Sequence, residues 1–249
     1  HTRYISVTGV QTCALPIWVP HWLFLKPASV EARSLERQAL ARFAERCGIL
    51  VDAPARPKAS GTFYVSNHIS WADIAVLGSL LDARFVARAD LAGWPLAGWL
   101  ARRHGTIFVE RARPGDSRSQ ADAIATALAS GHNVLLFAEG TTSDGSGVLP
   151  FRPALFAAAI AARRVQPVAL AYRDACGSVL PQHRQRAIAW IGEDGLNHAL
   201  AAFADGRVTA AVRFPPPLVP ADFPCRKSLA RAAQASVAAA YAALRNRSK

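Results

Sequence analysis

The sequence predicts an α/β protein with one mostly parallel central sheet flanked by helices. Its 249 residues are enough for one large domain with a full core. Short apolar runs alternate with segments of helical spacing from about residue 49 onward. That alternation is typical of parallel strands joined by helical connections, which cover both faces of a sheet. No repeat and no linker divides this part of the chain, so we expect a single domain over residues 49–249.

The order of the elements follows from apolar periodicity and from breaking residues. A first helix is expected over 29–47, where Val30, Leu40 and Phe43 share a face and Gly48 follows as a stop signal. A short strand and a loop rich in Pro and Ala come next. The expected strands are 49–51, 62–65, 85–87, 106–109, 133–138, 166–172, 187–191 and 208–214. The later expected helices are 71–81, 94–102, 117–130, 153–163, 196–203 and 228–244.

The first residues have the sequence of a translated sequencing adapter. The eleven residues 7–17 read VTGVQTCALPI, a peptide that a common adapter strand encodes. We interpret residues 1–17 as foreign to the protein and exclude them from the fold. The chain contains no Met, which fits a gene that lost its start codon. Residues 18–48 are then expected to be a truncated, membrane-proximal helical segment, because residues 18–26 combine aromatic and apolar side chains as membrane-interface segments do.

The composition is strongly basic. The formal net charge is +12, or +11 once Arg3 is excluded with residues 1–17, and it comes from 25 Arg and only 4 Lys. Such a surface favours a polyanionic partner, either nucleic acid or an anionic membrane. No run of 18 apolar residues predicts a membrane-spanning helix. Cys47, Cys176 and Cys225 form no CxxC pair, which indicates reduced thiols and a cytosolic location.

The first candidate site is NHISWAD, residues 67–73, directly after an expected strand. His68 and Asp73 are five residues apart, and on one continuous helix that spacing would turn them about 140° apart. If Ser70 is the N-cap, Asp73 becomes the third helical residue and His68 lies in the loop before the helix. The carboxylate can then reach back and orient the imidazole, as it does for a catalytic His. The alternative is an ordinary capping box with a structural His.

Two further polar segments follow expected strands. The segment GTIFVER, residues 105–111, ends in an Arg that can bind a phosphate bidentately. FAEGTTSDG, residues 137–145, continues from a buried strand into a turn whose backbone N–H groups suit an oxyanion or a phosphate. This turn lacks the Lys of a P-loop, and the chain contains no GxSxG motif. The alternatives are a solvated surface Arg and an ordinary strand-to-helix loop.

All three segments leave the sheet at the end of a strand. The carboxyl ends of parallel strands meet at one edge, where α/β proteins place their sites. We therefore expect the three segments to converge on a single site. No group of His, Cys and Asp residues has the spacing of metal ligands, so no metal is expected there.

In order and spacing these segments resemble the sequence blocks of the 1-acyl-sn-glycerol-3-phosphate acyltransferase family. The blocks read NHISWAD, GTIFVER, FAEGTTS and, at residues 165–168, VQPV, and the resemblance covers about residues 60–172. It implies a glycerolipid-acyltransferase-like fold, with His68 as general base and Asp73 as its partner. Arg152 is expected to add positive charge near the acceptor. The residues implied for substrate binding are Asn67, Gly105, Phe108, Arg111, Glu139, Gly140, Thr141 and Arg152.

The resemblance also implies a reaction. A fatty acyl group would pass from acyl-CoA or acyl carrier protein to the free hydroxyl of a lysolipid, with no cofactor, at the cytoplasmic face of the bacterial inner membrane. Lysophosphatidic acid is the expected acceptor, and an anionic membrane surface is an expected partner.

Two departures bear on the acceptor. Ala138 replaces a Pro of the family pattern, and Thr142 replaces an Arg, which removes an anion contact. EGTTSDG followed by LPFRPALF resembles the lyso-ornithine lipid acyltransferase branch, so lyso-ornithine lipid is the alternative acceptor. A third alternative is a non-catalytic basic protein that binds membranes or nucleic acid. It explains the charge but not the ordered segments, and without an RNP-like motif we expect no nucleic-acid partner.

Overall fold

The computed structural model describes residues 29–54, 59–110, 116–189 and 206–246. Three parts of the expected organisation lie outside these ranges. They are the adapter-like residues 1–17, residues 18–28 of the membrane-proximal segment, and the expected helix 196–203. The helix expected over 29–47 is present as α2 (Val30–Arg46), capped by the Ser29 hydroxyl, which accepts a hydrogen bond from the Ala32 N–H.

A seven-stranded sheet with the order β1-β7-β6-β2-β5-β3-β4 forms the centre of the protein. The strands are β1 (Ile49–Asp52), β2 (Thr62–Ser66), β3 (Arg84–Arg88), β4 (Ile107–Val109), β5 (Val134–Phe137), β6 (Arg164–Asp174) and β7 (Val208–Arg213). All neighbouring strands are parallel except β6 and β7, which are antiparallel. The expectation of a mostly parallel sheet is therefore confirmed, with one reversal near the β1 edge.

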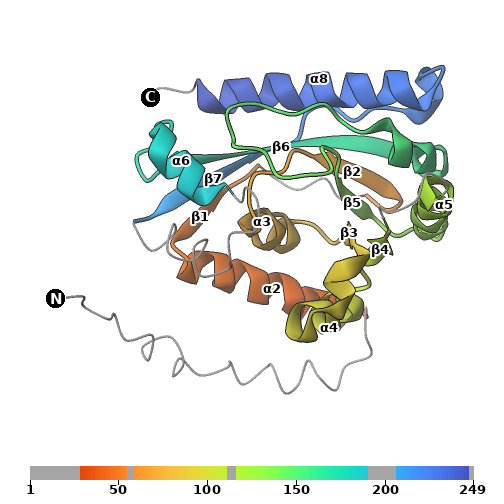
Figure 1. Ribbon diagram of the computed structural model, residues 1–249, viewed down its shortest axis with the longest axis horizontal. Helices are drawn as coiled ribbons and strands as arrows, with labels where there is room; N and C mark the ends of the chain where they lie inside the picture. Colours follow the sequence, from red (N-terminus) through yellow and green to blue (C-terminus); the bar gives the residue numbers. More distant parts are fainter. Residues whose placement is uncertain (1–28, 55–58, 111–115, 190–205, 247–249) are drawn as a thin grey trace.

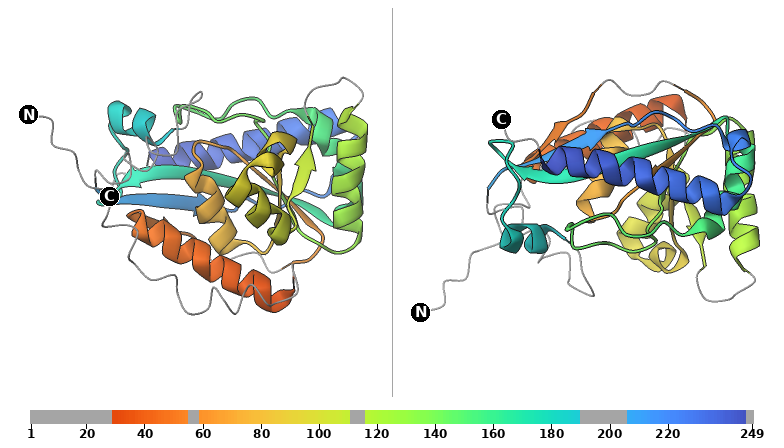
Figure 2. Two further views of the ribbon diagram at one scale, coloured as in Figure 1. Left: turned by 60° about the horizontal axis from the view of Figure 1, so that its bottom comes forward. Right: turned by 90° about the horizontal axis from the view of Figure 1, so that it is seen from above.

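Helices cover both faces of this sheet (Figure 1). On one face α8 (Arg226–Arg245) runs across β6 and β7, as the view from above shows (Figure 2). On the other face lie α2, α3 (Ala72–Leu80) and α4 (Pro95–His104). At one end α5 (Asp116–Ala129) packs on the 3₁₀ segment η3 (Pro153–Ala161). The short helix α6 (Gln182–Ile188) follows β6.

The central strands are buried on both faces, which explains their apolar composition. Every residue of β2 is buried, and so are nine consecutive residues of β6. Strands covered by helices on both sides show continuous apolar runs instead of alternation. Because β2 lies between β5 and β6, the loop that follows β2 is held between two rigid neighbours.

One expected element is wrong, and another is formed as a different type of helix. The strand expected over 187–191 is not formed in the described part of that range, because α6 continues through Ile188. The helix begins after its N-cap, Pro181, with the polar residues QHRQR. The apolar residues Ala187 and Ile188 form its last positions and not the start of a strand. The helix expected over 153–163 is present as 3₁₀ turns and ends at Ala161. Two further 3₁₀ segments, η2 (Ala89–Gly93) and η4 (Pro220–Asp222), have no counterpart in the expected elements.

Candidate active site

His68 and Asp73 are in direct contact at the carboxyl end of β2. The Nδ1 atom of His68 lies 2.8 Å from the Oδ2 atom of Asp73. β2 ends at Ser66 and α3 begins at Ala72, so the residues between them form a loop. This loop folds the imidazole back toward the start of the helix, a placement that five residues on a continuous helix would not allow.

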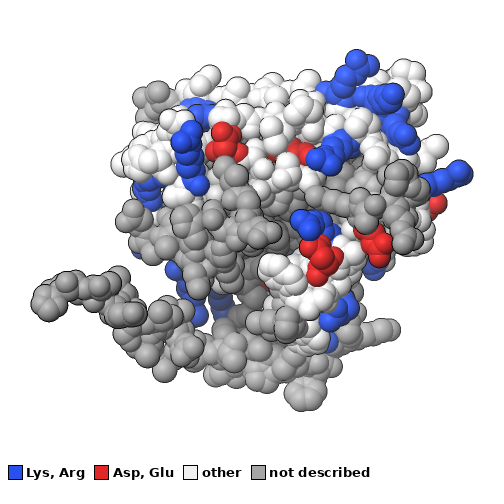
Figure 3. Space-filling model, in the orientation of Figure 1, with Lys and Arg blue, Asp and Glu red and all other residues white. Residues whose placement is uncertain are grey.

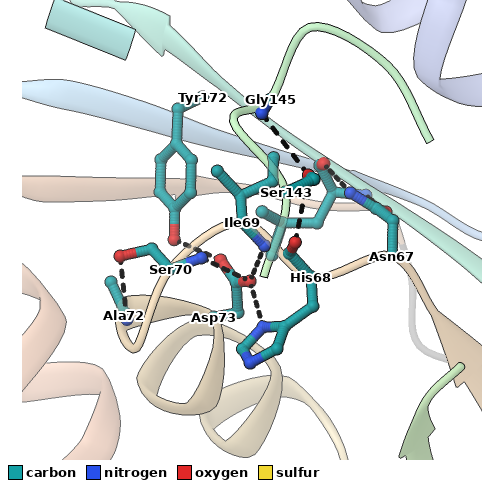
Figure 4. Close-up of polar contacts among 10 residues, drawn as sticks. Asn67, His68, Ile69, Ser70, Ala72, Asp73, Ser143, Gly145 and Tyr172 are labelled. Carbon is teal, nitrogen blue, oxygen red and sulfur yellow. Dashed lines mark hydrogen bonds and ion pairs between the residues drawn. The ribbon is translucent and has the colours of Figure 1, made fainter. Parts of the chain in front are cut away.

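The Asp73 carboxylate is fully buried and accepts four hydrogen bonds (Figure 4). Its Oδ2 atom receives the backbone N–H groups of Ile69 at 2.7 Å and Ser70 at 3.0 Å, in addition to His68. Its Oδ1 atom receives the phenol of Tyr172 at 2.7 Å. Asp73 therefore both caps the helix and holds the imidazole, so the two readings of this segment are compatible.

The capping geometry differs in detail from the expectation. The N-cap position is Trp71 and not Ser70, so Asp73 is the second helical residue and not the third. Ser70 contributes only half of a capping box, because its backbone N–H reaches Asp73 while its hydroxyl accepts from Ala72 at 3.4 Å.

Tyr172 is a site residue that the sequence did not reveal. It lies on β6, 99 positions from Asp73, and its side chain is buried. Burial, followed by the nearby Asp73 carboxylate, raises the pKa of Tyr172 well above its ordinary value, so the phenol stays protonated and donates. Only the sheet order, which puts β6 beside β2, brings the two residues together.

The ring of His68 is held from one side and partly open on another. It stacks on the ring of Phe137, with centroids 3.9 Å apart and planes inclined by 13°. The His68 side chain is 18% exposed. Its Nδ1 atom is taken by Asp73, whereas Nε2 has no hydrogen-bond partner within the ranges that the structure describes. This leaves Nε2 as the ring atom that can exchange a proton with a substrate.

The turn after β5 is bonded directly to the His68 loop. The Ser143 N–H donates to the His68 carbonyl at 2.8 Å, and the Ser143 hydroxyl donates to the same oxygen at 3.1 Å. The Ala138 N–H donates to the Ser66 carbonyl at 2.9 Å. Two of the three segments expected to converge therefore do so, through β2 and β5.

Glu139 stands in this turn with a buried carboxyl group. It is 2% exposed, and among the described residues neither carboxylate oxygen has a hydrogen-bond partner. Burial raises the pKa of Glu139 to about 8; the nearby backbone N–H groups of His68 and Leu149 oppose this change, and the Asp73 charge adds to it. Glu139 therefore titrates close to neutral pH.

Arg152 lies across the same turn. Its backbone N–H donates to the Ala138 carbonyl at 2.8 Å, and its side chain passes over Gly140. A Cβ atom on Gly140 would stand 2.7 Å from Cδ and 2.8 Å from Nε of Arg152, and Gly140 has a φ of +72°. Only glycine fits both this contact and this conformation. Thr141, next in the turn, and Arg152 are exposed, so both can meet a ligand.

Other residues expected to bind substrate take different positions. Asn67 is fully buried, and its amide both donates to and accepts from the Leu170 backbone at 2.9 Å, so it fixes the loop to β6 instead of facing a substrate. Gly105 caps α4 with a φ of +79°, before β4 and therefore away from the carboxyl edge. Phe108 is half-buried within β4. Arg111 lies outside the described residues.

Comparisons with known proteins agree with this arrangement. Residues 50–172 match the family described as Acyltransferase. Lyso-ornithine lipid O-acyltransferase of Brucella abortus (strain 2308) is 41% identical over 67% of this chain and 66% of its own length. The enzyme of that name from Rhizobium meliloti (strain 1021) is 35% identical over 78% of this chain and 68% of its own. 1-Acyl-sn-glycerol-3-phosphate acyltransferase of Neisseria gonorrhoeae is 37% identical over 52% of this chain and 51% of its own length.

The fold is that of a solved structure. The crystal structure of 1-acyl-sn-glycerophosphate acyltransferase from Thermotoga maritima superposes with a TM-score of 0.64, covering 93% of this chain and 88% of the other, at 20% identity. The chain spans about two thirds of the length of the Brucella and Rhizobium relatives. The chain belongs to the acyltransferase family that includes the lyso-ornithine lipid and 1-acyl-sn-glycerol-3-phosphate acyltransferases.

Proposed function

We propose that this protein transfers a fatty acyl group from a thioester donor, acyl-CoA or acyl carrier protein, to the free hydroxyl of a lysolipid. The observation that carries the proposal is the buried Asp73 carboxylate, which fixes Nδ1 of His68 and leaves Nε2 available at a partly open position. That is the geometry of a general base for a hydroxyl nucleophile.

The proposed reaction follows from this geometry. Nε2 of His68 takes the proton of the acceptor hydroxyl, and the oxygen attacks the thioester carbonyl carbon. The tetrahedral intermediate collapses, the carbon–sulfur bond breaks, and the imidazolium returns its proton to the leaving thiolate. Asp73 stays ionised throughout and stabilises the imidazolium, as the carboxylate of a catalytic triad does. No cofactor takes part in this scheme.

Acceptor binding is assigned to the turn after β5. Gly140 and Thr141 offer backbone and hydroxyl groups there, and the Arg152 side chain crosses the turn with its guanidinium exposed. Arg152 is therefore our candidate for the positive charge that Thr142 does not supply. Arg111, at the end of GTIFVER, is a second proposed anion contact.

Lyso-ornithine lipid is the acceptor that we favour, and lysophosphatidic acid is the second candidate. The chain spans about two thirds of the length of the lyso-ornithine lipid O-acyltransferases of Brucella and Rhizobium. It spans about half of the length of the Neisseria 1-acyl-sn-glycerol-3-phosphate acyltransferase. The Thr at position 142 also suits an acceptor without a phosphate. We propose the cytoplasmic face of the inner membrane as the location. Among the described residues no helix is long and apolar enough to cross a membrane.

An acceptor panel tests this proposal. Purified protein is offered labelled acyl-CoA or acyl carrier protein with lyso-ornithine lipid, lysophosphatidic acid or lysophosphatidylethanolamine, and kcat/KM is measured for each. We expect kcat/KM to be highest for lyso-ornithine lipid, and Arg152→Ala to raise the acceptor KM without changing the donor KM. A preference for lysophosphatidic acid of tenfold or more would replace lyso-ornithine lipid with the second candidate.

A further inference from the structure

A cavity lies at the edge of the sheet where β2, β5 and β3 begin, and we call it the amino-edge cavity. Ser60 just before β2, Arg84 at the start of β3 and Asn133 just before β5 line it, and its volume is about 300 Å³. His68 follows the opposite end of β2, and a five-residue strand spans roughly 16 Å. The volume is at the lower end of the range for small-molecule sites, and no step of the proposed acyl transfer uses this cavity.

The charges around the amino-edge cavity are unequal. Arg33 and Arg84 line it, and within the described part of the chain Asp82 is its single acidic lining residue. The Nε atom of Arg33 lies 2.9 Å from Oδ1 of Asp82, and Nη1 of Arg37 lies 3.7 Å from Oδ2. One carboxylate thus serves two guanidinium groups, and no lining carboxylate is left for Arg84. The excess charge at the cavity is therefore positive.

Arg84 contacts a neutral side chain instead. Its Nη2 atom lies 3.0 Å from Nε2 of His132. Because a guanidinium can only donate, Nε2 must accept, which requires the neutral form of the imidazole. The Nε atom of Arg84 is buried and has no hydrogen-bond partner among the described residues. A half-buried cation that faces a neutral ring lacks the counter-charge that an ion pair supplies.

The protonation of His132 would respond to an anion in this cavity. Burial, followed by the charges of Arg84 and Arg33, lowers the pKa of His132, and the Asp82 charge opposes this change. An oxyanion between the two guanidinium groups would offset their charges and favour the imidazolium form. Nε2 of His132 would then donate to the anion, and Nη2 of Arg84 would be released to do the same. Anion binding and protonation of His132 therefore promote each other.

Hydrogen bonds hold the walls of the amino-edge cavity in place. The Asn133 side chain accepts from the Thr62 N–H at 3.0 Å and donates to the Asp82 carbonyl at 3.0 Å. The Arg84 N–H donates to the Asn133 carbonyl at 2.9 Å. A Cβ atom on Gly131 would meet nothing within 4 Å, so this wall faces open space. A site that is formed before its ligand arrives loses little free energy in ordering.

Basic residues elsewhere on the protein lack such a recess. Lys and Arg side chains gather over the amino-terminal end of α8 (Figure 3), where Arg226 and Lys227 are exposed. Water and salt screen exposed charges of this kind. The Arg33 side chain, in contrast, is only 18% exposed. The α8 residues are therefore a matched control for a loss of charge without a loss of the cavity.

We propose that the amino-edge cavity binds a tetrahedral oxyanion of the phosphate type, either as a free ion or as a phosphomonoester group. Arg33 and Arg84 donate to it, and His132 provides a further donor once it is protonated. The planar guanidinium group suits phosphate oxygens, which it can bind bidentately. The inference goes beyond the proposed function, because the cavity and His68 lie at opposite edges of the sheet.

Sulfate titration of the full chain tests this inference. Its dissociation constant is measured by calorimetry at pH 5.5, 6.5 and 7.5 and constant ionic strength, because sulfate keeps its charge over this range. We expect saturable binding that tightens as the pH falls, since the bound anion raises the pKa of His132. Arg33→Gln with Arg84→Gln should weaken binding at least tenfold. Arg226→Gln with Lys227→Gln, which removes the same charge, should change it less than twofold.

Further variants and ligands complete the test. His132→Gln cannot become charged, so its sulfate affinity should no longer depend on pH, whereas His68→Ala should bind sulfate as the wild type does. Equal affinities for inorganic phosphate and phenyl phosphate would indicate a free ion, and tenfold tighter phenyl phosphate would indicate a phosphomonoester group.

Four results would overturn the inference. They are no saturable binding by the wild type, equal losses in the two double variants, an unchanged pH dependence in His132→Gln, and weaker binding by His68→Ala. None of these readouts depends on acyl transfer, so the proposed function can fail or hold independently of them.

Discussion

At the scale of single residues, Asp73 connects the fold to the chemistry. It accepts two backbone N–H groups of its own loop, the imidazole of His68 and the phenol of Tyr172. Replacing it with Ala would leave several buried donors without a partner, which costs about 1–3 kcal/mol for each group. Asp73→Asn is therefore the better probe of catalysis, because it keeps the shape and part of the hydrogen bonding.

The Tyr172 phenol should act on turnover through Asp73. Tyr172→Phe removes one hydrogen bond to a buried carboxylate, a loss of about 1.5–3 kcal/mol, so we expect kcat to fall roughly tenfold or more at unchanged acceptor KM. In an Asp73→Asn background the same change should have little further effect, because the path through the carboxylate is already broken. Steady-state kinetics of the four proteins check this.

Tyr64→Phe is the matched control for that cycle, since it removes a phenol that is also buried and lies on β2. It should lower the melting temperature without lowering kcat. If Tyr172→Phe lowers kcat as much in the Asp73→Asn protein as in the wild type, Tyr172 does not work through Asp73.

Glu139 should make the stability of the fold depend on pH. Its pKa rises from 4.5 to about 8 on folding, so its contribution to the free energy of unfolding is fully present below pH 4.5 and is lost as the pH passes about 8. At about 1.4 kcal/mol per pKa unit the loss is at most on the order of 5 kcal/mol. Glu139→Gln should flatten this dependence in urea unfolding at pH 5, 7 and 8.5. Parallel curves for the two proteins would show that the Glu139 carboxyl is not neutral in the fold.

At the scale of elements, the C-terminal helix holds the turn that faces His68. The Tyr241 phenol and the Arg245 guanidinium of α8 donate to the Gly145 carbonyl at 2.6 Å and 3.1 Å, and Gln185 of α6 donates to the same oxygen. Ser143, two residues earlier, donates to the His68 carbonyl. Hydrogen bonds thus connect α8 to the His68 loop through a single turn.

Tyr241→Phe should therefore affect catalysis as well as stability. Loss of one buried neutral hydrogen bond costs about 1 kcal/mol of unfolding free energy. If loss of this hydrogen bond also lets the turn shift relative to His68, kcat should fall roughly two- to fivefold with little change in donor KM. Thermal unfolding and kinetics are measured on the same preparation. A destabilised variant with full kcat would mean that α8 supports only the core.

Local patterns made the elements and the His68–Asp73 pair predictable from sequence. The pair is five residues apart, and a strand, a loop and a cap determine its geometry. Tyr172 and the contacts of Gly145 depend on which strands are neighbours and on where α8 lies, and apolar periodicity contains no information on strand order. Asn67 was placed in the correct loop, but its hydrogen bonds to Leu170 could not be predicted, because Leu170 lies 103 residues away on a strand whose neighbours the sequence does not specify.

At the scale of the whole molecule, the sheet order assembles the site. The carboxyl ends of β2 and β5 are adjacent, with register pairs up to Ser66 and Phe137, so the His68 loop and the Glu139 turn emerge together. β6 supplies Tyr172 from the other side of β2. The net charge, +11 once Arg3 is excluded, is compatible with the proposed acceptor in an anionic membrane.

The most direct test of the central claim is transfer of a labelled acyl group by wild type and by His68→Ala. Each is offered acyl-CoA or acyl carrier protein with lyso-ornithine lipid and with lysophosphatidic acid. His183→Ala, at an exposed position on α6, is the control for loss of an imidazole. We expect product from wild type and the control, and a rate at least 10³-fold lower for His68→Ala at an unchanged melting temperature. Wild-type rates in His68→Ala, or no transfer by the wild type to either acceptor, would contradict the account.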